Sequence, residues 1–88
     1  MSNSTEDTRF HTISEFKECL IRGGEIAFSW NNTNYTVTSY AGKYAISQFY
    51  SQKTEQRYET PDEVLEYMVG ADRLRDVIKQ VTVLDRTI

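Results

Sequence analysis

The protein is 88 residues long, with 39% hydrophobic and 26% charged residues; this length supports one hydrophobic core, and this composition excludes a chain that is disordered throughout. Ten Lys and Arg against thirteen Asp and Glu give a net charge of −3, which disfavours general nucleic-acid binding because like charges repel at long range. The longest apolar runs are three residues long, far too short for a membrane-spanning helix.

The N-terminal region predicts a tail followed by a helix. Residues 1–11 are mostly polar and are expected to form a flexible tail, so that a single folded domain spans residues 12–88. Thr12 and Glu15 match the Thr-x-x-Glu capping box, in which each side chain accepts a hydrogen bond from a backbone N–H at the start of a helix. Apolar residues then recur at spacings of three and four, at Ile13, Phe16 and Leu20. We therefore expect a helix over about 12–22, ended by the two glycines that follow it.

The next part of the chain predicts antiparallel strands. From Glu25 the apolar residues alternate with small and polar ones, which is typical of strands with one buried face. Short runs of turn-forming residues separate the segments, and tight turns join antiparallel neighbours. The expected strands cover about 25–30, 35–40 and 44–50, with a shorter fourth strand near 55–59 after a polar connection over 51–54.

The C-terminal part predicts two helices and a last strand. Thr60, Pro61 and Glu63 supply an N-cap, a proline at the first helical position and a second capping box. The expected helix ends at Gly70, and its buried face consists of Val64, Leu65 and Met68. Asp72 is expected to cap a short helix whose apolar residues are Leu74, Val77 and Ile78. The segment 81–84 is expected to cover an edge of the sheet.

These elements predict an α+β fold. We expect a small, mainly antiparallel sheet of three to five strands, with an N-terminal helix and one or two C-terminal helices packed on one face.

No pattern for catalysis, metal binding or cofactor binding is present. His11 has no Cys or Asp close by in the sequence to suggest a triad. A metal site of His11, Glu15 and Cys19 is disfavoured because His11 precedes the helix and Cys19 lies on its apolar stripe. The glycine pair follows a helix, whereas glycines that hold phosphate precede one. We therefore predict that the protein is not an enzyme and has no cofactor.

Four carboxylates form a candidate partner-binding surface around the second expected helix. They are Glu59, Asp62, Glu63 and Glu66. One interpretation is a solvated helix face whose acids favour the positive end of the helix dipole. The other is an acidic surface that docks on a basic partner.

The second candidate surface is the sheet face turned away from the helices. If Ile26, Phe28 and Ile46 face the helices, alternation places Tyr40 and Phe49 on the opposite face. Small residues surround these two rings: Ala27, Thr36, Thr38, Ala45 and Ser47. Aromatic anchors among small polar residues suit a protein interface, and they can also stack on single-stranded nucleic acid. The alternative is that the rings only reflect β propensity and core filling.

Three parts of the sequence resemble uncharacterised small proteins encoded by phages and mobile elements of Gram-positive bacteria. These parts are 24–32, 60–67 and the ending formed by 73–77 and 85–88. The resemblance implies no activity for any residue. It brings to attention that small acidic proteins of such elements include inhibitors of host defence nucleases, such as anti-CRISPR proteins.

The leading functional hypothesis is a non-catalytic protein-interaction or regulatory module that binds a protein partner. One alternative is an acidic inhibitor that mimics nucleic acid and binds a basic, nucleic-acid-binding host protein. Another is a weak binder of single-stranded nucleic acid. We expect a monomer or a homodimer formed through the sheet. Because Cys19 is the single cysteine and no apolar leader follows Met1, we expect a cytoplasmic location.

Overall fold

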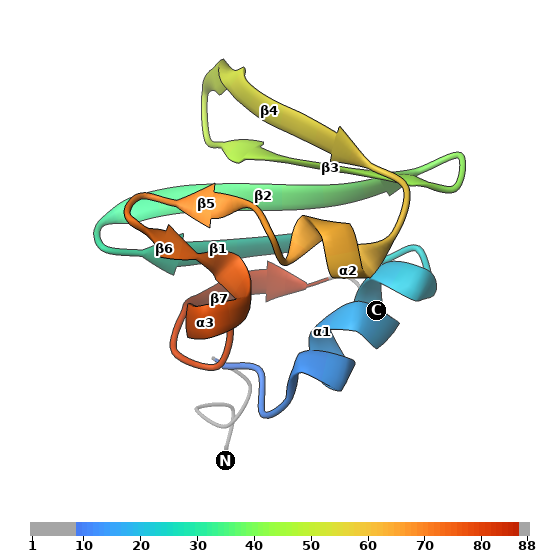
Figure 1. The fold of residues 1–88 in the computed structure, drawn as a ribbon, viewed down its shortest axis with the longest axis horizontal. Helices are drawn as coiled ribbons and strands as arrows, with labels where there is room; N and C mark the ends of the chain where they lie inside the picture. Colours follow the sequence, from blue (N-terminus) through green and yellow to red (C-terminus); the bar gives the residue numbers. More distant parts are fainter. Residues whose placement is uncertain (1–8, 87–88) are drawn as a thin grey trace.

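A computed structural model describes residues 9–86 of the chain. It shows a small α+β domain with a five-stranded antiparallel sheet and three short helices, as expected from the sequence (Figure 1). The elements follow in the order α1 (Ile13–Ile21), β1 (Ile26–Trp30), β2 (Thr33–Tyr40), β3 (Lys43–Gln48), β4 (Ser51–Tyr58), α2 (Pro61–Val64), β5 (Met68–Val69), β6 (Asp72–Arg73), α3 (Leu74–Val77) and β7 (Thr82–Arg86).

The five-stranded sheet has the order β4-β3-β2-β1-β7, so that β1 to β4 form a meander and β7 covers the edge beside β1. Two-residue turns join the first three strands. Asn31 and Asn32 both have positive φ, as do Ala41 and Gly42, which is the conformation that matches the twist of a hairpin. The first turn is therefore shorter than expected, and β2 already begins at Thr33.

The connection between β3 and β4 differs from the prediction. The expected strand over 44–50 ends at Gln48, and the turn is formed by Phe49 and Tyr50 instead of the polar residues after them. The Thr54 hydroxyl explains the difference: it accepts a hydrogen bond from the Gln48 N–H at 2.8 Å and donates one to the Ser51 carbonyl at 2.7 Å. These two hydrogen bonds of the Thr54 side chain take the place of backbone hydrogen bonds between β3 and β4 at the point where their register shifts. Strand β4 therefore starts earlier and is longer than expected.

Helix α1 begins as predicted, because the Thr12 hydroxyl accepts from the Glu15 N–H at 3.0 Å. The Glu15 carboxylate accepts from the His11 N–H at 2.7 Å and forms an ion pair with Arg86 at 3.1 Å. Burial alone would raise the pKa of Glu15, but these two partners outweigh it and lower the pKa below its ordinary value.

The packed structure begins before Thr12, where folding was expected to start. Phe10 is 1% exposed and meets Phe16 edge to face, with 5.4 Å between the ring centroids. The Arg86 guanidinium lies 4.8 Å from the centroid of the Phe10 ring. Residues 1–8 of the expected tail lie outside the described residues.

Helix α2 is much shorter than expected. Its capping box is present in both directions between Thr60 and Glu63, but the helix ends after one turn at Val64. The Tyr67 hydroxyl donates to the Thr54 carbonyl at 2.9 Å, which directs the chain toward β4 and into the small β5–β6 hairpin. Met68, expected to be buried, is therefore 52% exposed in β5.

The expected cap of the last helix is also wrong. The Asp72 carboxylate accepts a hydrogen bond from the Trp30 indole N–H at 3.1 Å, and α3 begins after Arg73 with no side-chain cap. The apolar residues of this helix are buried as predicted: Leu74, Val77 and Ile78.

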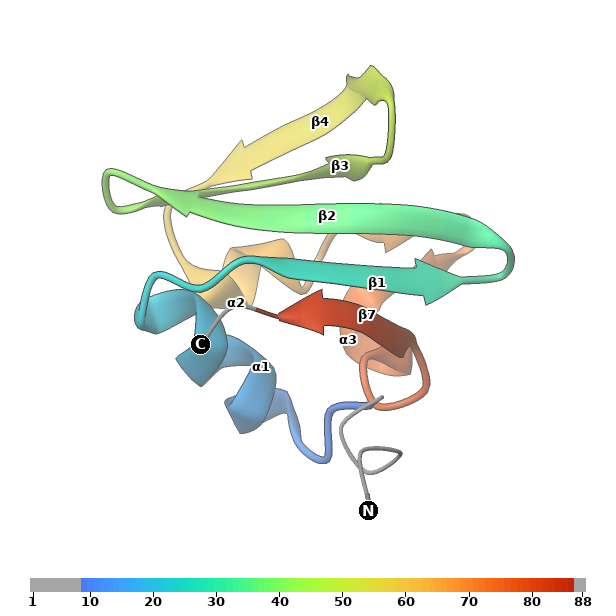
Figure 2. The same cartoon turned by 180° about the vertical axis from the view of Figure 1, so that it is seen from behind.

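The buried side chains of the strands meet those of the helices in one core. Figures 1 and 2 show α1, α2 and α3 on the same side of the sheet. From the strands the core takes Ile26, Phe28, Tyr35, Val37, Ile46, Val69 and Val83; from the helices and loops it takes Phe10, Phe16, Cys19, Leu20, Val64, Leu65, Tyr67, Leu74, Val77, Ile78 and Val81. Among the described residues, no helix has the length and apolar character required to cross a membrane.

Candidate functional site

The sheet surface opposite the core, called the open face below, has a floor of small side chains. The strand pairing places Ala27 beside Thr36 and Thr36 beside Ser47, and it places Thr38 beside Ala45 and Ala45 beside Arg57. On β1, β2 and β3 these residues alternate with buried core residues, so they lie on the other side of the sheet, and Arg57 lies beside Ala45 there. Small side chains leave the backbone surface accessible to another molecule.

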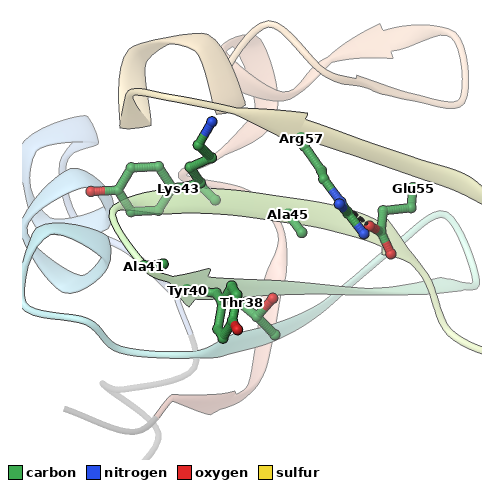
Figure 3. Close-up of a pocket in the computed structure, with 8 residues that line it drawn as sticks. Thr38, Tyr40, Ala41, Lys43, Ala45, Glu55 and Arg57 are labelled. Atoms are coloured by element: carbon green, nitrogen blue, oxygen red, sulfur yellow. Dashed lines mark hydrogen bonds and ion pairs between the residues drawn. The ribbon is translucent and has the colours of Figure 1, made fainter.

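One end of the open face carries an exposed aromatic ring. Tyr40 is 81% exposed at the end of β2, opposite Lys43. It borders a hollow of about 540 Å³, shown in Figure 3. The hollow is lined by Thr38, Tyr40, Ala41, Lys43, Tyr44, Ala45, Glu55 and Arg57. In the figure Tyr40 and Thr38 lie together on β2, while Arg57 reaches along β4 to Glu55.

The charged groups of this hollow are paired with one another or with neighbours. The Arg57 guanidinium contacts the Glu55 carboxylate at 2.7 Å, and the Lys43 ammonium contacts the Glu59 carboxylate at 3.7 Å. Arg57 is still 78% exposed, so its remaining N–H groups can donate to a partner. The hollow thus offers an aromatic surface and hydrogen-bond donors, a combination that suits binding.

The other end of the open face carries two adjacent aromatic residues. Phe49 and Tyr50 form the β3–β4 turn, with 5.9 Å between the ring centroids in an edge-to-face arrangement. They line a second hollow of about 360 Å³ together with Thr36, Ser47, Gln48, Ser51 and Gln52. Tyr50 is fully exposed and has a φ of 61°. A bulky residue is uncommon in this left-handed region, and such strain often marks a functional position.

The two predicted rings of the open face do not form one platform. Phe49 lies six residues after Lys43, the strand partner of Tyr40, which corresponds to roughly 20 Å along an antiparallel strand. Tyr40 and Phe49 are therefore separate anchors at opposite ends of the small-residue floor. Tyr50 was missed, because nothing in the sequence distinguishes a tyrosine in a left-handed turn from one in a strand.

The four predicted acidic residues do not form a common helix face. The Asp62 carboxylate pairs with Lys17 at 2.9 Å, and the Glu63 carboxylate accepts from the Glu59 and Thr60 N–H groups. Glu66 lies beyond the end of α2.

Two arginines neutralise Glu66. Its carboxylate pairs with Arg73 at 3.3 Å and with Arg75 at 2.8 Å. The Glu59 carboxylate pairs with Lys43, and the Glu63 carboxylate has the capping role. Each of the four carboxylates thus has a cationic partner or a capping role. The acidic surface is largely compensated by cations from other elements.

Other contacts engage two of the residues considered for a metal site. Glu15 is paired with Arg86, and Cys19 is 2% exposed in the core, where burial raises the pKa of its thiol. Within residues 9–86, no cluster of three or more His, Cys, Asp or Glu could hold a metal ion.

Comparisons with protein-family models, curated proteins and solved structures find no significant match for this chain.

Proposed function

We propose that the protein is a non-catalytic interaction module that binds another protein through the open face of its sheet. One observation carries the proposal. Tyr40 and Tyr50 are 81% and fully exposed at opposite ends of a floor of small side chains. Exposed large aromatic residues are costly for a small domain, which needs its apolar residues for the core, and they are the most frequent energetic anchors of protein interfaces.

As part of the proposal, the helices pack over one face of the sheet only and leave the other face open. Under this arrangement the core uses the inward side chains of β1, β2 and β3 and leaves their outward side chains for a partner. Arg57 and the backbone around Ala45 add polar contacts between the two aromatic ends. A partner that spans the open face would meet both anchors at once, which is how a small surface reaches useful affinity.

The two other hypotheses have weaker support. Mimicry of nucleic acid requires carboxylates that are free to meet a basic partner, but Asp62 and Glu66 are paired with cations of this chain. Binding of single-stranded nucleic acid requires cations that are free for phosphate, but Lys43 and Arg57 meet carboxylates. The resemblance to proteins of phages and mobile elements, the cytoplasmic location and the absence of enzyme activity stay predictions.

A capture experiment from the source cells tests the proposal. The baits are the wild-type chain, the double variant Tyr40→Ser/Tyr50→Ser, and the control Ile21→Ser, which removes a side chain that is 64% exposed on α1. We expect the same specific partner on the wild type and the control, and a loss of about tenfold or more with the double variant. Equal capture by all three baits, or no specific partner at all, would contradict the proposal.

A fourth bait separates the proposal from charge mimicry. Asp62→Lys reverses one carboxylate of the acidic cluster without touching the open face. The interaction module keeps its partner with this bait. A charge mimic would lose it, and adding salt would release the partner from the wild type as well.

A further inference from the structure

Strand β4 forms one edge of the five-stranded sheet. Within the described residues it pairs with β3 only, along Ser51–Tyr58. An edge strand presents a row of backbone N–H and C=O groups that can pair with another chain. One of the carbonyls, that of Thr54, accepts from the Tyr67 hydroxyl at 2.9 Å. The opposite edge, β7, is tied down at its end by the contacts of Arg86 with Glu15 and Phe10.

The side chains of β4 carry charges of alternating sign on the open face. Arg57 lies opposite Ala45, and Glu55 lines the same hollow. Glu55 and Arg57 thus place a negative and a positive charge two residues apart on one face of the strand. Such a pattern can be complementary to itself when two copies run antiparallel.

The charges select one register for such a pair. If Gln56 lies opposite the partner's Gln56, then Glu55 lies opposite the partner's Arg57, and Arg57 opposite the partner's Glu55. Directly opposite side chains have Cβ atoms about 4.5–5.5 Å apart, which permits two ion pairs across the axis. A shift of the axis by one residue would place Glu55 opposite the partner's Glu55, where like charges repel.

A third register is less favourable for a different reason. With Thr54 on the axis, Arg57 would lie opposite the partner's Ser51 and would meet no carboxylate there. Gln56 itself is exposed. The register centred on Gln56 therefore places both Glu55 and Arg57 opposite a partner residue of opposite charge.

We infer that β4 pairs with β4 of a second copy of this chain, antiparallel and centred on Gln56, so that the two five-stranded sheets form one continuous sheet. The inference goes beyond the proposed function and does not depend on it. It joins two open faces into one surface and brings the two hollows around Glu55 and Arg57 next to the axis.

Charge reversal tests the pairing. Sedimentation velocity of the full chain, from low micromolar to millimolar concentration, is expected to show a reversible dimer. Glu55→Arg and Arg57→Glu should each weaken the dimer about tenfold or more, because two opposite-charge pairs become two like-charge pairs at once. The double exchange Glu55→Arg/Arg57→Glu should restore it. A chain that stays monomeric at all concentrations, or a dimer whose affinity is unchanged by the single charge reversals, would overturn the inference.

The double exchange also controls for folding. Each single variant loses the contact between Glu55 and Arg57 within the chain, and the double exchange restores it with reversed polarity. Thermal unfolding of the dilute variants measures this internal effect separately. If the single variants are folded and monomeric while the double exchange dimerises, the pairing of two copies is responsible.

Two single-cysteine variants test the register of the β4–β4 pair. Residues directly opposite in an antiparallel pair have Cα atoms about 4.5–5.5 Å apart, within the range of about 4.4–6.8 Å for a disulfide. Gln56→Cys should therefore form a disulfide between two copies under mild oxidation. Gln52→Cys is the matched control, since it is also an exposed glutamine on β4 but lies four residues from the axis. Equal cross-linking of both variants, or faster cross-linking of Gln52→Cys, would reject the register.

Discussion

Tyr50 occupies a backbone conformation that a different residue would adopt more easily. Its φ of 61° falls in the left-handed region, which costs an L-residue about 1–2 kcal/mol, and less for Asn. The ring is fully exposed, and its described ring contact is with Phe49 at 5.9 Å between centroids. An exposed ring pair contributes about 0.5 kcal/mol.

The substitution Tyr50→Asn should therefore stabilise the fold. Relief of the backbone strain contributes about 1 kcal/mol to the free energy of unfolding, and loss of the ring contact removes about 0.5 kcal/mol. The net gain of about 0.5 kcal/mol corresponds to an increase of about 2–4 °C in the melting temperature of a domain of this size. The control is Tyr40→Asn, because Tyr40 lies in regular strand β2 and Asn is a poor strand former, so its melting temperature should fall.

The assay is thermal unfolding of both variants and the wild type, followed by circular dichroism, together with partner binding. We expect Tyr50→Asn to raise the melting temperature while it weakens binding. This opposite response would indicate that the chain keeps a strained tyrosine for contact with a partner. A lower melting temperature for Tyr50→Asn would refute the reasoning about strain.

Three further predictions concern the contacts that hold the fold. Phe10→Ala should reduce the free energy of unfolding in urea by about 3–5 kcal/mol, because it empties a buried site against Phe16. Because the pKa of Glu15 is lowered in the folded state, its ionised carboxylate stabilises the fold at pH values above its ordinary pKa of 4.5. This contribution to the free energy of unfolding should be lost as the pH falls through the lowered pKa of the folded state. Glu15→Gln should therefore make the free energy of unfolding less dependent on pH in this acidic range. Asp72→Ala should expose the Trp30 indole to water and shift its fluorescence to longer wavelength.

Controls make these predictions specific. Arg9→Ala, an exposed neighbour of Phe10, should change the stability by less than about 0.5 kcal/mol. Arg86→Gln should reproduce part of the effect of Glu15→Gln. The packing of the N-terminal segment is refuted if Phe10→Ala is as mild as Arg9→Ala. The role of the ion pair is refuted if the acid unfolding of Glu15→Gln follows that of the wild type, and the Trp30 contact is refuted by unchanged emission of Asp72→Ala.

Local signals in the sequence were sufficient for much of the fold. Alternation of apolar residues located β1 and β2, and the capping residues located the starts of α1 and α2, since these features act within a few residues. What could not be predicted depends on distant contacts. The hydrogen bond between Tyr67 and Thr54 ends α2 after one turn, and the pairing of Arg86 with Glu15 joins residues 71 positions apart.

The candidate site shows the same division. Alternation identified Tyr40 and the small residues around Ala45 as neighbours on one face. The separation of Tyr40 from Phe49 depends on where β3 ends, and the exposure of Tyr50 depends on a turn that the Thr54 hydroxyl stabilises. Ion pairs between distant elements, such as Lys17 with Asp62, compensate the acidic cluster in a way that sequence spacing does not reveal.

Amide NMR spectra of the labelled chain, recorded with and without its captured partner, test the central claim most directly. If the open face is the binding surface, the largest shift changes will occur at Thr38, Tyr40, Ala45 and Tyr50, and α2 and α3 will change little. Shift changes concentrated around Asp62 and Glu66, with the open face unaffected, would contradict the account.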